Sequence, residues 1–537
     1  MRVYYYKEGK KYVAKSSNED VELTTKSVDN RTTITLKAKQ NIQLIKADDT
    51  IPFHVNFKDF YFLNGYQSWT DTKEFRLAER LRNIKRSPHI ISHMFAMARY
   101  GDTPFYKYSI KKSHGYDIFY SKGQYESFIY SLNYKTAYLV IELIKDKTSL
   151  HLISQVEGIS LTKDEEVNIF DYYMFFNFME GLNSFKTVYP ENIPERLFGY
   201  TSWYNYYQNI NEEIILKDLD ALDSRFNIFQ IDDGYETFVG DWLDIDQKKF
   251  PNGLKPIVDK IHEKEFKAGI WLAPFIAEKN SKLFKEHQDW FKKEKNGKPL
   301  KCGGNWSGQY ALDLDKKEVV DYIKKSLTYY MDLGFDFFKL DFLYAAGLPL
   351  YEGRSRCQAQ YNAYKMLREI LKDKLILGCG ANIINSFGNF DYLRVGPDVS
   401  LIFDDVAYMR VFHRERISTK ITMQNTVFRS FFNKHLFGND PDVFLLRNEN
   451  IKLSFEQRKA LTKINALFGT VLMTSDNVAT YNDEQKKILE EALDMFRRAK
   501  VDSWKSRKNY IDVKYHVDDE QHEFTYSVNK GVFTYER

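Results

Sequence analysis

The chain has 537 residues, well beyond the roughly 100 to 200 of one typical domain, so a single small module is excluded. Hydrophobic residues make up 43% and charged residues 28%, a balance typical of globular proteins that excludes a disordered chain. The 78 Lys and Arg residues against 74 Asp and Glu leave a net charge of +4. This charge is too small to favour nucleic acid or an anionic membrane as a partner.

The cysteines and the N-terminal segment indicate the compartment. Cys302, Cys357 and Cys379 are the only cysteines and none lies in a CxxC pair, so a disulfide framework is not expected. The first residues, MRVYYYKEGKKYVAK, lack the apolar core of a secretory signal. No apolar run reaches the roughly 20 residues needed to cross a bilayer. We therefore expect a cytoplasmic protein without membrane contact.

Up to about residue 180 the hydrophobic pattern has a period of two. Ile34, Leu36 and Ala38 alternate with polar residues, as in strands with one buried face. This pattern predicts an antiparallel β-sandwich. The sandwich is expected to end at VYPENIPERL, where Pro190 and Pro194 interrupt any regular ladder.

From Leu197 onward short apolar runs alternate with amphipathic stretches of helical period. The candidate strands are LFGYTSWY, NIFQIDDG, KAGIWLAPF, FDFFKLDFLY, KLILGCGA, DYLRVGPDV, DVFLLR and TVLMTSD. Eight such units predict a (β/α)8 barrel. An open doubly wound sheet is the alternative, but its Gly-rich nucleotide-binding turn is missing. After the barrel the period of two returns, so we expect units of 1–188 (β-sandwich), 195–500 (barrel) and 501–537 (small β-domain).

Charged and aromatic residues gather at the expected carboxyl ends of the barrel strands, where barrel enzymes hold their active sites. In strand order these residues are Asp232, Asp233, Trp271, Lys339, Asp341, Cys379, Gly380, Arg394 and Asp398. The sequence therefore predicts that four carboxylates, two cations and a tryptophan meet at one mouth.

Two of these carboxylates are candidates for acid/base chemistry. Asp341 lies in an apolar run, where an ionised carboxylate is costly unless it is paired or functional. An ion pair with Lys339, on the same side of the strand, is the structural alternative. Asp398 follows Gly396-Pro397, and an ordinary turn aspartate is its alternative. Together the two would face one cavity from separate strands, as glycoside cleavage requires.

The adjacent Asp232 and Asp233 could instead ligate a metal such as Mg²⁺. No HExxH motif is present, the eleven histidines show no ligand spacing, and none lies at these strand ends. Carboxylates accept hydrogen bonds from sugar hydroxyls, and Trp203 and Trp271 offer flat faces to a pyranose ring. We therefore expect a small carbohydrate ligand and no metal or organic cofactor.

Seven segments, in order along nearly the whole chain, resemble glycoside hydrolase family 36, the retaining α-galactosidases and related α-N-acetylgalactosaminidases. They are NGYQSW (64–69), QIDDGYE (230–236), GIWLAPF, FFKLDF, LGCGA, LRVGPDV and NDPDVFLLR (439–447). The resemblance implies the same architecture, namely an N-terminal β-sandwich, a (β/α)8 barrel and a small C-terminal β-domain.

The resemblance also implies roles for individual residues. Asp341 would be the nucleophile and Asp398 the general acid/base. Substrate contacts would come from Trp203, Asp232, Asp233, Trp271, Lys339, Cys379, Gly380 and Arg394, and Trp69 would lean over the barrel mouth from the N-terminal domain. The implied activity is hydrolysis of terminal non-reducing α-galactosides, of the melibiose or raffinose type, with retention through a covalent glycosyl-enzyme.

Several alternatives stay open. An α-N-acetylgalactosaminidase would differ near Cys379 to Asn382, by the C2 substituent, and an α-galactosyl transglycosylase would use the same two carboxylates. A non-catalytic sugar-binding protein would need no acid/base pair, and a metal-dependent hydrolase would need ligands that are missing. Longer family members with a Cys-Ser-Gly-Gly-Gly-Gly segment form tetramers. This chain has LGCGANIINSFG instead, which favours a monomer or small homo-oligomer.

Overall fold

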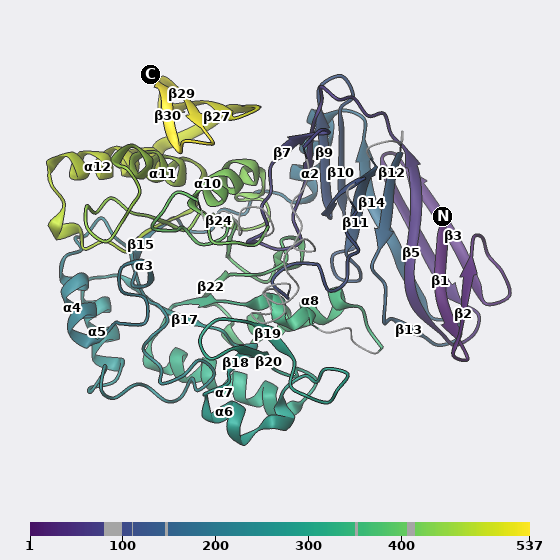
Figure 1. The fold of residues 1–537 in the computed structure, drawn as a ribbon, viewed down its shortest axis with the longest axis horizontal. Helices are drawn as coiled ribbons and strands as arrows, with labels where there is room; N and C mark the ends of the chain where they lie inside the picture. Colours follow the sequence, from purple (N-terminus) through teal and green to yellow (C-terminus); the bar gives the residue numbers. More distant parts are fainter. Residues whose placement is uncertain (80–98, 110, 145–148, 349–352, 405–413) are drawn as a thin grey trace.

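A computed structural model of the chain describes residues 1–79, 99–109, 111–144, 149–348, 353–404 and 414–537. A β-sandwich lies beside a barrel, and a small sheet rests on the barrel helices α11 (Phe455–Phe468) and α12 (Asp483–Arg498) (Figure 1). The expected multidomain fold class is confirmed. Within the described residues, no helix has both the length and the apolar character that crossing a bilayer requires.

The sandwich is made of two antiparallel sheets. One contains β1 (Arg2–Lys7), β2 (Lys10–Ala14), β5 (Ile42–Pro52), β8 (Lys112–Tyr116), β11 (Leu139–Ile144), β12 (Ser149–Ser154) and β13 (Ser160–Leu161). The other contains β3 (Val21–Val28), β4 (Arg31–Ala38), β6 (Phe60–Leu63), β7 (Glu74–Arg76), β9 (Ile118–Lys122), β10 (Ser127–Ser131) and β14 (Glu166–Phe175). Ile34, Leu36 and Ala38 are all buried in the sandwich core, as their period of two predicts.

The part of the second sheet that β6, β9 and β10 form is buried on both faces. In β10 Ile129 points into the sandwich core, whereas its neighbours Phe128 and Tyr130 belong to the hydrophobic cluster that continues into the barrel. Successive side chains of a strand point to opposite faces, so this one sheet serves two cores. The sandwich is thereby fixed against the barrel by apolar packing.

The barrel strands are parallel and each of the eight candidate runs contains one. They are β15 (Leu197–Thr201), β16 (Ile228–Ile231), β17 (Lys267–Leu272), β21 (Phe337–Leu340), β22 (Leu375–Gly378), β23 (Tyr392–Arg394), β24 (Gly438–Asp440), β25 (Val443–Phe444) and β26 (Val471–Thr474). All are hydrogen-bonded in the order β24-β23-β22-β21-β17-β16-β15-β26-β25.

The seventh strand differs from the expected run 442–447. It begins upstream at Gly438 and is split, so that β24 pairs with β23 and β25 pairs with β26. Pro441, between the two pieces, has no N–H to donate to a ladder. Asp442 has a φ of 72°, which is outside the strand region. The break therefore turns the Asp442 carboxylate away from a regular strand position.

The helices after the barrel strands are α3 (Trp203–Tyr206), α4 (Glu212–Asp220), α5 (Lys255–Glu263), α7 (Lys317–Leu333), α8 (Arg356–Leu371), α10 (Thr419–Phe428), α11 and α12. The connection between β17 and α7 also contains the short helix α6 (Lys282–Glu286). A small sheet in the same connection consists of β18 (Ile276–Glu278), β19 (Lys301–Gly303) and β20 (Gln309–Ala311). Capping boxes at Ser454 and Asn482 begin α11 and α12, as the sequence spacing predicts.

Between β22 and β23 the chain forms only a 3₁₀ turn, Ile384–Ser386, in place of a covering α-helix. Phe387 packs edge-on against Tyr134 and Tyr189 there. The N-terminal segment thus covers the part of the barrel wall that a fifth helix would otherwise bury.

The C-terminal sheet consists of β27 (Ala499–Arg507), β28 (Tyr510–Val517), β29 (Glu520–Ser527) and β30 (Val532–Glu536). Trp504 packs edge-on against Phe428 of α10, and Glu536 pairs with Lys463 of α11. We propose the division into units 1–188, 195–500 and 501–537, since no helix or strand spans residues 189–196, between α2 (Phe178–Val188) and β15.

Candidate active site

Asp341 immediately follows β21 at the barrel mouth. Its carboxylate accepts hydrogen bonds from the Trp271 indole Nε1 at 3.1 Å and from the Phe342 backbone N–H at 2.8 Å. Burial raises the pKa of Asp341 to about 6, the nearby Asp398 charge adds to this, and Lys339 opposes it. A carboxyl with such a raised pKa in a pocket is typical of a functional site.

Lys339 does not form the ion pair with Asp341 that was the structural alternative. Its Nζ lies 2.8 Å from Oδ2 of Asp232, and both side chains are buried. The same Asp232 oxygen accepts hydrogen bonds from Gln230 at 2.6 Å and Thr201 at 3.1 Å. Asp341 is therefore left without an ion pair of its own among the described contacts.

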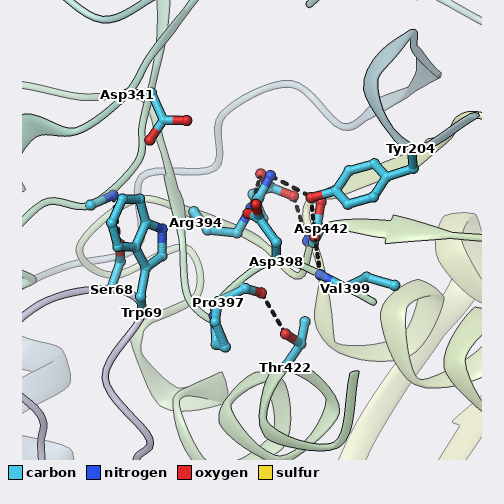
Figure 2. A network of polar contacts seen from close by, with 12 residues as sticks. Ser68, Trp69, Tyr204, Asp341, Arg394, Pro397, Asp398, Val399, Thr422 and Asp442 are labelled. Carbon is cyan, nitrogen blue, oxygen red and sulfur yellow. Dashed lines mark hydrogen bonds and ion pairs between the residues drawn. The ribbon is translucent and has the colours of Figure 1, made fainter. Parts of the chain in front are cut away.

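Asp398 follows β23 and its carboxylate is held by a buried arginine. Arg394 donates hydrogen bonds from Nη1 to Asp398 at 2.9 Å and from Nε to Asp440 at 3.0 Å, and its Nη2 forms an ion pair with Oδ1 of Asp442 at 2.9 Å (Figure 2). The Asp398 side chain remains 37% exposed, whereas the other two carboxylates are buried. Asp398 thus reaches the open part of the site while Arg394 fixes its position.

Three carboxylates share the one guanidinium, so one of them is expected to hold a proton. Burial raises the pKa of Asp442 to about 7, and the Asp398 and Asp440 charges contribute. Oδ2 of Asp442 accepts hydrogen bonds from the Tyr204 hydroxyl at 2.5 Å and the Val399 N–H at 2.6 Å. This arrangement relieves the negative charge beside Asp398.

Asp233 directly follows Asp232 in the sequence, but it accepts hydrogen bonds from different partners. It accepts hydrogen bonds from the Trp306 Nε1 at 2.9 Å and from Gln208 at 3.0 Å. Burial raises its pKa, and burial together with Asp233 raises the pKa of Glu236. Trp306 was missed by the sequence analysis because it lies in the connection between β19 and β20, where no periodic pattern marks it.

Trp69 comes from the sandwich, yet its ring packs at the barrel mouth. It lies edge-on to Tyr100, Phe342 and Tyr344, with ring centroids 6.1, 5.4 and 5.9 Å away. A Cβ on Gly380, which has a φ of +63°, would approach this ring to 3.0 Å. A larger residue at position 380 would therefore displace Trp69.

The remaining candidates lie at or just after the carboxyl ends of β15, β17 and β22. Trp271 is buried and packs against Trp242 and Trp306, whereas Trp203 is half-buried and lies edge-on to Tyr207 at 5.2 Å. Burial raises the pKa of the Cys379 thiol well above its ordinary value. The substrate contacts assigned to these residues stay predictions.

Metal ligands do not gather at this mouth in the described part of the chain, where no group of three or more His, Cys, Asp or Glu side chains has the geometry to hold an ion. Asp232 instead meets Lys339, and Asp440 and Asp442 meet Arg394. A site in which cations of the protein neutralise the carboxylates can bind and polarise an uncharged polyhydroxylated ligand.

Replacing Trp69 by Ala should raise the KM for the substrate about tenfold. An aromatic ring in contact with a ligand contributes on the order of 1 kcal/mol or more to the binding free energy, in addition to the effect of the surface area that it buries. Trp290→Ala, which removes a ring packed against Tyr322 of α7, is the matched control and should leave KM unchanged. Steady-state kinetics and thermal unfolding of both variants check this. A large fall in the Trp69→Ala unfolding midpoint at an unaltered KM would instead assign Trp69 to core packing.

Comparison with known proteins gives a consistent match. The family model described as Melibiase matches residues 196–366. The α-galactosidase Mel36A of Lactobacillus acidophilus is 28% identical over 230 residues, which cover 37% of this chain and 31% of that protein. The match thus spans about a third of the length of the curated relative.

Solved structures match over a greater length. The Thermus thermophilus α-galactosidase TtGalA, in complex with p-nitrophenyl α-D-galactopyranoside, has a TM-score of 0.72 at 24% identity, covering 97% of this chain and 98% of that one. The family 36 α-galactosidase AgaA of Geobacillus stearothermophilus has a TM-score of 0.65 at 12% identity, covering 94% and 73%. These similarities establish the fold.

Proposed function

We propose that the chain, which is similar to the melibiase family and to structures of glycoside hydrolase family 36, is a retaining α-galactosidase. Its substrates would be terminal non-reducing α-galactosides of the melibiose or raffinose type. The observation that supports this proposal is the pair Asp341 and Asp398, which follow the barrel strands β21 and β23 in the chain and interact electrostatically (Figure 2). Both TtGalA, bound to an aryl galactoside and to stachyose, and Mel36A bear the name α-galactosidase.

The proposed first step is attack by Asp341 on the anomeric carbon. The Trp271 N–H and the Phe342 N–H orient its two oxygens, so one lone pair can point at the sugar. Asp398, which is partly exposed, gives a proton to the departing oxygen. A covalent β-galactosyl ester on Asp341 and a free aglycone result.

In the second step water attacks the ester. Asp398, now ionised, takes a proton from that water, and the product keeps the α configuration. Lys339, Asp232 and Asp233 are proposed to bind the sugar hydroxyls, since the Lys339–Asp232 ion pair and the hydrogen bonds of Asp233 to Trp306 and Gln208 fix these side chains before substrate enters. No metal or organic cofactor takes part in these steps.

The test is hydrolysis of an aryl α-galactoside compared with the matching aryl α-N-acetylgalactosaminide. Faster cleavage of the galactoside, unchanged after EDTA treatment and with α-galactose as the first product in NMR, supports the proposal. Preference for the N-acetyl substrate would make the chain an α-N-acetylgalactosaminidase. Transfer to an added sugar in place of water would make it a transglycosylase, and binding without turnover would make it a sugar-binding protein.

The pH dependence of kcat/KM should report the ionisation of Asp341. Its pKa is raised from 3.8 to about 6, so the carboxylate that attacks the sugar is lost as the pH falls through 6. We expect kcat/KM for an activated aryl galactoside to fall tenfold per pH unit below about 6. In Asp398→Asn this acid limb should move to lower pH, because the Asp398 charge raises the Asp341 pKa. An acid limb near pH 4 in the wild-type enzyme would contradict this.

We further propose that the enzyme works in the cytoplasm as a monomer or small homo-oligomer rather than a tetramer. Cys302, Cys357 and Cys379 are buried and free, which suits a reducing compartment. Light scattering on the purified chain measures the oligomeric state, and a tetramer would overturn that part.

A further inference from the structure

Arg429 ends helix α10 and is completely buried between the sandwich and the barrel. All five of its N–H donors are used. Nε donates to Oδ1 of Asn64, and Nη2 donates to the Gln67 carbonyl and the Thr72 hydroxyl. Nη1 donates to two carbonyls, that of Ser68 at 2.6 Å and that of Val395 at 2.8 Å. None of the five acceptors is a carboxylate.

The two carbonyls bound by Nη1 belong to the two segments that carry candidate site residues. Ser68 precedes Trp69, and its Oγ accepts a hydrogen bond from the Gly380 N–H at 2.9 Å. Val395 follows Arg394 and lies three residues before Asp398. One nitrogen therefore fixes the distance between the Trp69 loop of the sandwich and the Asp398 segment of the barrel.

Two further side chains on the same face of α10 form hydrogen bonds to the same two segments. The Asn425 amide donates to the carbonyls of Thr70 and Val395, and its Oδ1 accepts from the Thr72 N–H. The Thr422 hydroxyl donates to the carbonyl of Pro397, directly before Asp398 (Figure 2). Three side chains, at 422, 425 and 429, thus line one side of the helix and bind both segments.

We propose that Arg429 is a positioning residue that holds the Trp69 loop and the acid/base segment in register, so that galactoside binding and leaving-group protonation depend on this contact between the two domains. The proposal rests on the proposed function. Burial lowers the Arg429 pKa to about 9, so the side chain still carries its charge near neutral pH. A lysine ammonium has three donors in place of five and cannot span these acceptors.

Arg429→Lys should therefore raise KM and lower kcat at least tenfold for a galactoside with a sugar leaving group. The loss should be smaller for a dinitrophenyl galactoside, whose departure needs no proton. Arg356→Lys is the matched control, because Arg356 is also buried and joins the domains, through Tyr66 and Gln155, but binds neither Ser68 nor Val395. This control should keep the wild-type ratio of the two substrates.

Thr422→Val tests the Asp398 segment without changing Arg429. It replaces Arg429→Lys as the test if that variant does not fold. Thr422→Val removes the bond to the Pro397 carbonyl, together with a local bond to the Ser418 carbonyl at the start of α10, and leaves the Arg429 bonds in place, so kcat for the sugar leaving group should fall while KM stays unchanged. Hydrogen exchange gives a readout without turnover. Peptides covering 64–72 and 394–399 should exchange faster in Arg429→Lys than in the wild-type chain, and the 394–399 peptide should be unchanged in Arg356→Lys, because Arg356 bonds to Tyr66 within 64–72 only.

A wild-type ratio of the two substrates in Arg429→Lys, with unchanged exchange in both peptides, would overturn the proposal and leave Arg429 a purely structural group. An unchanged ratio in Thr422→Val would overturn it for the acid/base segment. If the wild-type chain cleaves no galactoside, the proposed function fails, and the exchange rates alone then decide whether Arg429 joins the two segments.

Discussion

Asp341→Gly should abolish turnover, by on the order of 10⁴-fold or more in kcat, even for an activated aryl galactoside. The proposed nucleophile is lost, and no other described carboxylate accepts the Trp271 and Phe342 donors. Added azide should enter the vacated space and restore product as β-galactosyl azide. Release of the aryl group with and without azide, and NMR of the sugar product, measure this.

Two controls accompany this variant. Asp259→Ala, at an exposed position of α5, should retain full activity. Asp341→Asn should be inactive but no less stable at neutral pH, because a pKa raised above its unfolded value means that the ionised group opposes folding there. Azide rescue giving α-galactosyl azide would assign Asp341 the acid/base role instead.

Asp398→Ala should slow cleavage of galactosides with sugar leaving groups by roughly 10²- to 10⁴-fold. Departure of an activated aryl group needs no acid, so its first step should survive and the ester should accumulate. A burst of aryl product followed by a slow steady state, and the galactosyl adduct on Asp341 in mass spectrometry, measure this. Azide should now attack the ester and give α-galactosyl azide.

The matched control is Asp404→Ala, since Asp404 lies on the same loop but bonds to Arg416 and Ser418 rather than to Arg394. It should show no burst. If Asp398→Ala lost activity equally towards good and poor leaving groups, the proton would have to come from another group, and Asp442, with a pKa near 7, would be the first to test.

The candidate site follows from the sequence wherever a residue directly follows a barrel strand. Asp341 and Asp398 could be predicted because apolar runs mark β21 and β23, and the barrel rule places whatever follows a strand at one mouth. Trp306 and Arg429 could not be predicted in the same way. Trp306 lies in an irregular connection, and Arg429 ends a buried helix that has no amphipathic pattern to mark its functional face.

The ion-pair partners of the site residues could not be predicted from the sequence either. The pattern on β21 left a Lys339–Asp341 ion pair as the structural alternative, but the structure pairs Lys339 with Asp232, a residue more than a hundred positions away. Similarly, the apolar run 442–447 indicated a regular seventh strand, whereas Pro441 splits it and brings Asp442 to Arg394. Such pairings depend on distances between elements, which no local pattern encodes.

The sequence by itself therefore determined the order of sandwich, barrel and C-terminal sheet, because hydrophobic periods of two and 3.6 residues report directly on which face of each element is buried. It also determined which carboxylates stand at strand ends. Only the tertiary structure decided how the Arg394 guanidinium pairs with three carboxylates and how Arg429 joins Ser68 to Val395. Ion pairing, burial and the resulting pKa of Asp341 are properties of groups brought together from distant parts of the chain.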